Sequence, residues 1–253
     1  MPFTLPDEPI LATRVNPKFM LIYGPRKVGK TSQLIKIPNN LVIDLEDGTD
    51  YVSGLKVKIP METPNWQLTE ITNPGKTDKD NEYWTYPPEV RTSFDCYFDF
   101  KQLCFEIRRA RKYKFVTIDT VDKLEEWAIA LARRNYKASN MGRNYKGSDI
   151  TTLPEGAGYK WTREALREIL QETLSLAEHV IFVGHIRDKL QTANATEVDS
   201  KELDLIGKHR SILCSYCDTV GHMYRKVAIG AAGGEIGLNF ISHENVLCSS
   251  RVP

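Results

Sequence analysis

The sequence has few cysteines, and their number is odd: five among 253 residues. A disulfide framework of the kind that staples small secreted domains is therefore not expected. Cys214 and Cys217 form a single C-x-x-C pair, which is half of a zinc site or a redox pair, but a zinc site needs four ligands. His209 and His222 are the nearest histidines, and no second C-x-x-C occurs. We expect free thiols in a reducing cytoplasm.

The chain also lacks a long apolar run and a strong net charge. No stretch approaches the roughly 18 apolar residues that a membrane span requires, and the first residues lack the basic and apolar regions of a secretory signal. The net charge is +1, so a basic footprint for nucleic acid would have to be local. We expect a cytoplasmic protein with no membrane partner, long enough to bury a core as one domain over residues 1–253.

Short apolar runs alternate with amphipathic stretches along most of the chain. Strands are predicted over residues 18–24, 40–48, 114–120 and 179–185, with a helix after most of them. This order favours an α/β fold with a mainly parallel sheet flanked by helices. The stretches on either side of "GAAGG" predict a C-terminal β-hairpin. Asp99 and Gln102 read as a capping box for a helix over residues 100–112.

Three polar segments interrupt this pattern. Residues 58–91 are rich in turn-forming residues and predict a surface excursion. Residues 133–160 and 187–210 are predicted as loops that could face nucleic acid or another subunit. We see no linker that would divide the chain.

The clearest motif is "GPRKVGKT" at residues 24–31, which fits G-x-x-x-x-G-K-[ST] at every fixed position. The glycines allow backbone N–H groups to surround phosphates, the lysine brings a charge to the β- and γ-phosphates, and the threonine hydroxyl can bind Mg²⁺. The match follows a predicted strand and precedes a predicted helix, as this motif requires. The predicted nucleotide-binding residues are Gly24, Pro25, Arg26, Lys27, Val28, Gly29, Lys30, Thr31 and Ser32.

A carboxylate ends the third predicted strand, "FVTIDT". Asp119 is placed to hold Mg²⁺ together with Thr31, the second anchor that such sites need. Asp119 does not begin the D-x-x-G of small GTPases, and no guanine-reading N-K-x-D occurs. ATP with Mg²⁺ is therefore predicted rather than GTP.

Two further strand ends carry polar side chains. In "VIDLEDG", Glu46 is our first choice to position the attacking water, while Asp44 and Asp47 compete for that role. His185 closes "VIFVGH" and could sense the γ-phosphate. Lys30, Glu46, Asp119 and His185 are the predicted catalytic set.

Taken in order, "GPRKVGKT", "LVIDLEDG", "FVTIDT", "GYKWTREALREILQETLSLAEHVIFVGH" and "DTVGHMYRK" resemble the RecA-like AAA-type ATPases of bacteriophages. This group includes the Sak4-like single-strand annealing proteins, and the resemblance covers residues 18–251. It implies a RecA-like P-loop NTPase core, Mg-ATP binding, homo-oligomeric rings or filaments, and annealing of single-stranded DNA in phage recombination. A single-strand-binding protein could be a further partner, and the host cytoplasm is the implied location.

The resemblance also implies that loops after the third and fourth strand units face DNA. The first of these, residues 133–148, has five cations, no acidic residue and two tyrosines. Cations that neutralise phosphates and tyrosines that stack on bases suit single-strand binding. The predicted DNA-binding residues are Arg133, Arg134, Tyr136, Lys137, Arg143, Tyr145 and Lys146.

Alternatives remain open from the sequence. A P-loop small-molecule kinase shares the phosphate loop and could use the same basic segment as a lid. A KaiC-like regulatory switch would use nucleotide only to set contacts between subunits. Arg210 or Arg251 could reach the nucleotide of a neighbouring subunit.

Overall fold

The computed structural model describes residues 16–63, 90–190, 198–227, 234–242 and 246–251. The strands are β1 (Phe19–Gly24), β2 (Asn40–Asp44), β3 (Lys56–Lys58), β4 (Phe115–Asp119), β5 (His179–Leu190), β6 (Val198–Leu203), β7 (Thr219–Val227), β8 (Gly234–Asn239) and β9 (Ser249–Ser250). The helices are α1 (Lys30–Leu34), α3 (Ser93–Ala110), α4 (Val121–Ala138), α5 (Ala157–Glu172) and α6 (His209–Tyr216).

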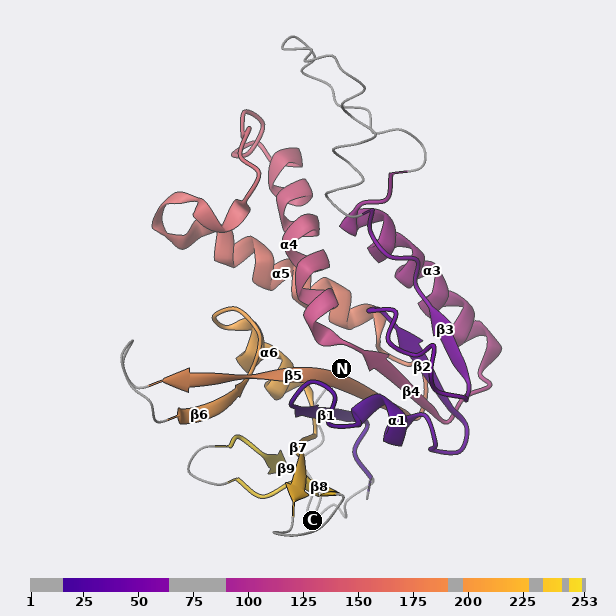
Figure 1. Cartoon of the computed structure of the whole chain (residues 1–253). Helices are drawn as coiled ribbons and strands as arrows, with labels where there is room; N and C mark the ends of the chain where they lie inside the picture. The colour runs from indigo at the N-terminus through magenta and orange to yellow at the C-terminus, as the bar shows by residue number, and fades with distance from the viewer. Residues whose placement is uncertain (1–15, 64–89, 191–197, 228–233, 243–245, 252–253) are drawn as a thin grey trace, which may run out of the picture.

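The strands form one mixed sheet in the order β3-β2-β4-β5-β1-β7-β8 (Figure 1). Every neighbouring pair from β3 to β7 is parallel. The antiparallel pairs are β7 with β8, β7 with β9, and β5 with β6. The predicted fold class is confirmed, including the mainly parallel sheet and the C-terminal hairpin, which is β7 and β8.

Parallel pairing brings the carboxyl ends of β1, β2, β4 and β5 to one edge of the sheet. The register sets Gly24 of β1 beside His185 of β5, and Asp44 of β2 beside Asp119 of β4. Segments that are far apart in the sequence therefore meet at this edge, where α/β proteins bind ligands.

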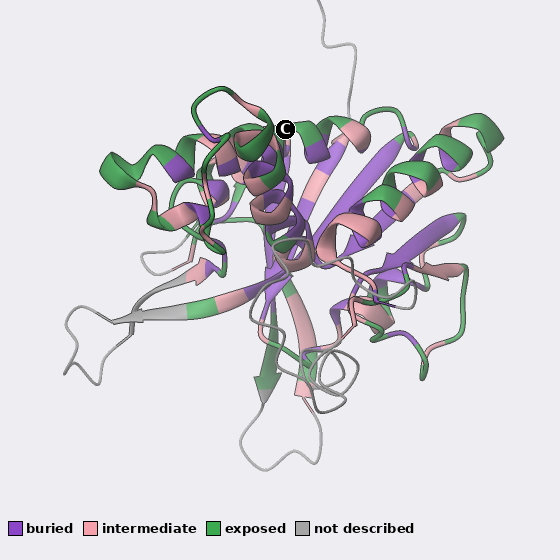
Figure 2. Ribbon diagram, turned by 90° about the horizontal axis from the view of Figure 1, so that it is seen from above, coloured by how far each residue is buried: buried purple, intermediate pink, exposed green. Residues whose placement is uncertain are grey.

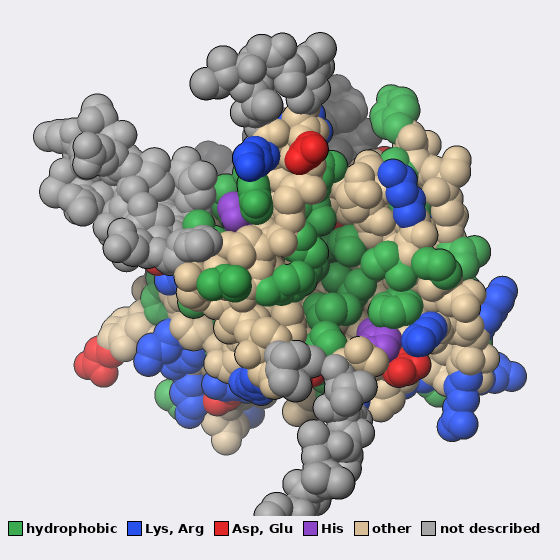
Figure 3. All heavy atoms as spheres, turned by 90° about the horizontal axis from the view of Figure 1, so that it is seen from below, with side chains coloured by type: hydrophobic (Ala, Val, Ile, Leu, Met, Phe, Trp, Pro, Cys, Tyr) green, Lys and Arg blue, Asp and Glu red, His purple; other side chains and the backbone are tan. Residues whose placement is uncertain are grey.

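The two faces of the sheet are covered unequally. Helices α3, α4, α5 and α6 pack on one face around a large cluster that includes Phe100, Trp127 and Phe182. On the other face, the helix among the described residues is the five-residue α1, which lies over a smaller cluster that includes Ile22 and Ile181. Figure 2 shows the buried strands between helices whose outer faces are exposed. Figure 3 views the side of α1 and β8, where hydrophobic side chains gather near the centre.

Alternation along β1 explains how one strand serves both clusters. Leu21 and Tyr23 belong to the larger cluster, and Ile22 between them belongs to the smaller one. Successive side chains of a strand point to opposite faces, and a strand buried on both faces reads as a continuous apolar run. The continuous apolar run of residues 18–24 therefore predicted this strand correctly.

The predicted capping box at Asp99 and Gln102 is wrong. Helix α3 begins at Ser93, and its capping box is formed by Thr92 and Asp95. Asp95 N donates to Thr92 Oγ1 at 3.4 Å, and Thr92 N donates to Asp95 Oδ2 at 2.8 Å. Asp99 lies within the helix, where its carboxylate pairs with Arg91.

Two of the predicted loops are more regular than expected. Strand β5 continues past His185 to Leu190 and forms a hairpin with β6, so most described residues of 187–210 are strand, and α6 begins at His209. Arg133, Arg134 and Lys137 lie on helix α4 rather than on a loop. Most of the predicted 58–91 excursion falls outside the described residues.

Within the described part of the chain, no helix is both long enough and apolar enough to cross a membrane.

Candidate nucleotide-binding site

The phosphate loop connects β1, which ends at Gly24, to α1, which begins at Lys30. Gly29 has a φ of 109°, a conformation that side chains rarely adopt. A Cβ at Gly24 would lie 2.2 Å from the carbonyl oxygen of Met223 on β7. Both fixed glycines of the motif are thus required by the structure. Gly29 is needed for its backbone conformation, and Gly24 is needed because β7 packs closely against it.

Lys30 is buried inside this loop, with 5% of its surface exposed. Its Nζ donates to the carbonyl oxygens of Gly24 and Pro25, each at 2.9 Å. Burial lowers the pKa of Lys30 to about 8, although the carboxylates of Asp119 and Asp122 act in the opposite direction. A buried cation beside a concave run of backbone suits an anionic ligand, because the ligand would offset the cost of burying the charge.

Thr31 and Asp119 meet at the carboxyl edge of the sheet. Thr31 Oγ1 donates to Asp119 Oδ2 at 2.5 Å. Burial raises the pKa of the Asp119 carboxyl above its usual value, and the hydrogen bond from Thr31 opposes that shift. A hydroxyl and a carboxylate in contact offer the hard oxygen ligands that Mg²⁺ takes in nucleotide sites, so these residues fit that ion.

The three acidic residues of "VIDLEDG" lie in different environments. Asp44 is buried and accepts four hydrogen bonds, from the N–H groups of Glu46, Gly48 and Thr49 and from the Thr49 hydroxyl. Its carboxylate therefore organises the turn that follows β2. Asp47 is exposed and pairs with Lys58 at 2.5 Å.

Glu46 differs from both of these acids because its carboxylate lies at the start of α4. Its Oε1 accepts a hydrogen bond from Thr120 Oγ1 at 2.7 Å. One ligand atom each from Glu46, Asp122 and His185 lie within 4.8 Å of one another. Of the three candidates, Glu46 is the one grouped with Asp122 and His185.

Asp122 is a site residue that the sequence did not single out. It lies in the first turn of α4, three residues after Asp119, and its Oδ2 is 2.5 Å from Nδ1 of the buried His185. The guanidinium of Arg26 in the phosphate loop lies 3.8 Å from the same oxygen. The other oxygen, Oδ1, is buried without a partner among the described residues. The only signal in the sequence was its spacing in "TIDTVD", a common first-turn carboxylate.

The predicted DNA-binding segment divides into a packed part and an exposed part. Tyr136 packs edge-on against Tyr145 and Trp161, with ring centroids 5.4 and 5.5 Å apart. The Arg134 guanidinium lies 3.8 Å from the centre of the Phe94 ring. The rings of Tyr136 and Tyr145 pack against aromatic rings of the same chain, so they are less suited to base stacking than the sequence suggested.

The remaining cations of that segment lie on or after the end of α4. Lys137, Arg143 and Lys146 are exposed, and Arg133 is half-buried. Gly142 adopts a close turn there, since a Cβ would lie 2.0 Å from the Tyr136 carbonyl oxygen. These cations lie near or after the C-terminal end of α4, an element separate from the phosphate loop.

Arg210 and Arg251 have partners within the chain. Arg210 pairs with Glu202 of β6, and Arg251 donates to the Ser215 carbonyl oxygen at 3.1 Å. Cys214 and Cys217 are free thiols.

Comparison with known proteins gives one family match and several similar solved structures. A family model described as an AAA domain matches residues 16–252, and no curated protein matches the chain. Among solved structures, a prototypical ATPase from the type III secretion system of pathogenic bacteria is similar over 93% of this chain, with a TM-score of 0.43 and 15% identity. The RadB recombinase is similar over 81% of this chain, with a TM-score of 0.31 and 11% identity. The chain spans 58% of the first structure's length and 73% of the second's.

Proposed function

The chain belongs to the AAA domain family, and we propose that this nucleotide-binding ATPase domain hydrolyses Mg-ATP to control its assembly on single-stranded DNA. One observation supports the nucleotide chemistry most directly. The Thr31 hydroxyl contacts the Asp119 carboxylate at 2.5 Å, next to a phosphate loop that buries Lys30. A hydroxyl and an ammonium from the phosphate loop therefore meet a carboxylate from the end of β4 at one edge of the sheet.

Each residue has a part in this proposal. Thr31 and Asp119 hold Mg²⁺, which neutralises charge on the β- and γ-phosphates when it is bound. Lys30 and the loop N–H groups bind the phosphates and stabilise the charge that grows on the leaving oxygen. Glu46 orients the water that attacks the γ-phosphate. Asp122 holds the imidazole ring of His185 close to the Glu46 carboxylate.

The DNA part of the proposal comes from the basic segment and from the resemblance to phage annealing proteins. Residues 133–148 carry five cations and no acid, and Lys137 and Arg143 are exposed. We propose that these cations neutralise strand phosphates while the chain promotes annealing as a homo-oligomer, alone or with a single-strand-binding protein. The affinity should then fall as salt rises, by the counterion release that phosphate contacts cause.

The test of ATP hydrolysis is a phosphate-release assay with and without single-stranded DNA. Lys30→Ala should reduce turnover by roughly two orders of magnitude, as removal of one charge-stabilising donor does in other enzymes. Lys36→Ala is the matched control, since Lys36 is exposed just after α1. Equal turnover in the wild type and Lys30→Ala would exclude the phosphate loop as the site of hydrolysis.

The DNA part is tested separately, by anisotropy of a labelled oligonucleotide with a variant in which Lys137, Arg143 and Lys146 are changed to Gln. Weaker, less salt-sensitive binding is expected. Transfer of the γ-phosphate to a small acceptor, with no response to DNA, would instead favour the kinase alternative. Nucleotide-dependent assembly without DNA binding would favour the regulatory switch.

A further inference from the structure

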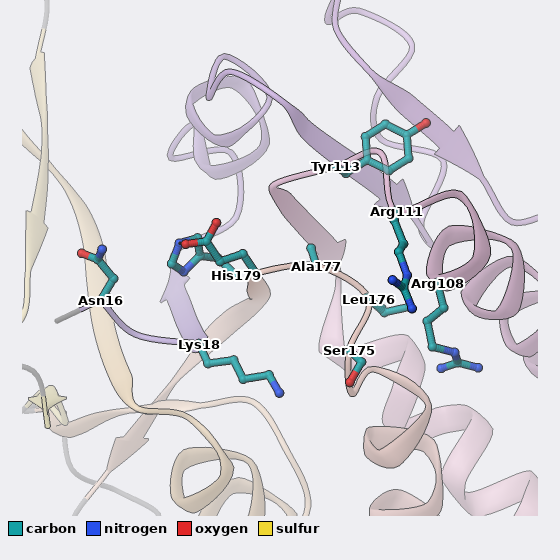
Figure 4. A pocket seen from close by; sticks show the side chains of 10 residues that line it. Asn16, Lys18, Arg108, Arg111, Tyr113, Ser175, Leu176, Ala177 and His179 are labelled. Carbon is teal, nitrogen blue, oxygen red and sulfur yellow. The ribbon is translucent and has the colours of Figure 1, made fainter. Parts of the chain in front are cut away.

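A polar cavity lies at the end of the sheet opposite the phosphate loop. Its volume is about 780 Å³. The walls are the chain that enters β1, the turn between α3 and β4, and the turn between α5 and β5 (Figure 4). These are the amino ends of the parallel strands, whereas the phosphate loop follows the carboxyl end of β1. The six residues of β1 separate the two sites by about 20 Å.

Three of the ten residues that line this cavity are cations. Lys18 extends from the β1 side, and Arg108 and Arg111 extend from the α3 side, with Ser175 between them in Figure 4. Glu178 is the acidic residue of the lining, and its carboxylate lies 3.4 Å from Nε2 of the adjacent His179.

The cationic surface continues beyond the cavity. Residues 108–114 read "RRARKYK", which places five cations in seven residues. Lys112 and Lys114 are exposed, and each is next in the sequence to a lining residue, Arg111 or Tyr113. We call these two lysines the rim of the cavity. Among the described residues, Lys18, Arg111 and Lys112 form no ion pair, whereas Arg108 pairs with Glu172 at 3.3 Å. This cluster is denser than the basic segment of residues 133–148.

Helix electrostatics explain only part of this charge. Arg108 and Arg109 lie in the last turn of α3, where cations interact favourably with the helix dipole. Lys112 and Lys114 follow the end of the helix, and Lys18 comes from another segment of the chain.

The backbone of two cavity residues is also unusual. Arg111 has a φ of 48° and Ser175 a φ of 62°. Helices often end with a residue in this left-handed conformation, and that residue is usually glycine because a side chain is strained there. Arg111 and Ser175 keep polar side chains at these two positions, and both side chains line the cavity.

We infer that this cavity and its rim bind the phosphate backbone of a nucleic-acid strand at a site separate from the nucleotide site. Phosphates are the anions that arginine and lysine recognise best when several cations are spread over one surface. A strand fits better than a small phosphate compound because the cations extend out of the cavity along the turn that ends at Lys114, where Lys112 and Lys114 lie over the neighbouring rings of Tyr113 and Phe115. The inference shares only its ligand with the proposed function and does not depend on ATP hydrolysis.

The test compares two variants that each lose three positive charges. The cavity variant carries Lys18→Gln, Arg111→Asn and Lys112→Gln, in which asparagine suits the left-handed backbone and the Arg108–Glu172 pair is kept. The control variant carries Lys36→Gln, Arg225→Gln and Lys226→Gln, three exposed cations elsewhere. Binding of a labelled 30-nucleotide single strand is measured by anisotropy over a series of salt concentrations.

We expect the cavity variant to bind roughly tenfold more weakly or worse, with a salt slope reduced by about 2, because three phosphate contacts are lost. The control should match the wild type, and a variant with Lys18→Arg, Arg111→Lys and Lys112→Arg should keep most of the affinity. Photocrosslinking of a thiouridine-containing strand should label the peptide of residues 108–114.

Several results would overturn this inference. Equal binding by the cavity and control variants would do so, as would crosslinks confined to residues 133–148. Displacement of the strand by equimolar ATP or pyrophosphate in a Lys30→Ala background would assign the cavity to a small phosphate compound instead. None of these results would affect phosphate release by the wild type, so failure here is distinguishable from failure of the proposed ATPase activity.

Discussion

Among the three acids at the end of β2 and just after it, the structure favours Glu46 as the residue that orients the attacking water. The sequence offered three carboxylates after β2, and their surroundings separate them. Asp44 is occupied by four hydrogen bonds that shape the turn, Asp47 pairs with Lys58 at the surface, and Glu46 lies with Asp122 and His185. A group that orients water must keep an oxygen available for it, which Asp44 does not.

This difference predicts the outcome of three substitutions. Glu46→Gln should lower kcat by roughly 100-fold while ATP binding is retained, because a positioned base contributes mainly to the chemical step. Asp47→Asn should leave kcat unchanged, and Asp44→Asn should lower stability because two of its acceptor sites are lost. Steady-state kinetics and urea unfolding of the three variants measure these effects. A fall in kcat for Asp47→Asn equal to that for Glu46→Gln would contradict the assignment.

The site residues differed in how far the sequence could predict them. Lys30, Thr31 and Asp119 were predicted because a fixed motif and a strand-end carboxylate mark them. Asp122 was missed because an acid in the first turn of a helix has an ordinary structural reason to be there. Its contact with His185 depends on β5 lying next to β1 and β4, which only the sheet order determines.

At the scale of single elements, the start of α3 shows how a local signal can mislead. Asp99 and Gln102 have the spacing of a capping box, but the apolar residues Tyr97 and Phe100 are buried in the core and carry the helix across that position. The helix extends back to Thr92, which forms the actual box with Asp95. The sequence therefore predicted that a helix exists but not where it begins.

Thr92→Ala should destabilise the protein by about 1 kcal/mol, the usual effect of losing an N-cap. Partial burial raises the pKa of Asp95, but the hydrogen bonds from Thr92 outweigh it and hold this pKa below its ordinary value. The stabilisation from Asp95 is thus present above the ordinary carboxyl pKa and is lost as the pH falls through the lower pKa of the folded state. Urea unfolding at pH 7 and in acid measures both effects, and Ser93→Ala is the control. A Thr92→Ala effect no larger than that of Ser93→Ala would contradict the cap.

A buried hydrogen-bond network connects three helices. Glu125 Oε1 on α4 accepts from the backbone N–H of Ile206 at 2.8 Å and lies 2.6 Å from Nδ1 of His209 at the start of α6. The other ring nitrogen of His209 lies 3.1 Å from the Thr162 hydroxyl on α5. All three side chains are buried and have partners, so we interpret this cluster as structural.

Glu125→Ala should therefore cost about 3 kcal/mol of unfolding free energy, because it leaves a buried N–H and a buried imidazole unpaired. Glu126→Ala is the matched control, since its pair with Lys123 lies at the surface and contributes at most about 1 kcal/mol. Chemical denaturation of both variants gives the comparison. Equal losses for Glu125→Ala and Glu126→Ala would show that the network does not stabilise the fold.

Strands β3 and β6 illustrate what local sequence leaves out. The sequences "KVK" and "VDSKEL" are polar and lack the apolar run that marked β1, β2 and β4. Each becomes a strand by pairing with a neighbour, β3 with β2 and β6 with the extension of β5. Pairing of this kind depends on tertiary context, which a single sequence does not reveal.

At the scale of the whole molecule, the parallel sheet separates the proposed nucleotide site from the cationic cavity. Its carboxyl edge gathers the phosphate loop, Glu46, Asp119 and His185, and its amino edge gathers the cations around Lys18 and Arg111. Alternating strands and helices predicted the first arrangement, because parallel strands place their following loops at one edge. The second arrangement was not predicted, since residues 108–114 read as the charged end of a helix.

The central claim is that Lys30, Thr31 and Asp119 together hold Mg-ATP. Its most direct test is calorimetric titration of ATP into the wild type with Mg²⁺ and with EDTA, and into the Thr31→Ala, Asp119→Asn double variant with Mg²⁺. The account predicts one ATP per chain, with an affinity that falls at least roughly tenfold when Mg²⁺ is removed or both metal-binding residues are changed. Equal affinity under all three conditions would contradict it.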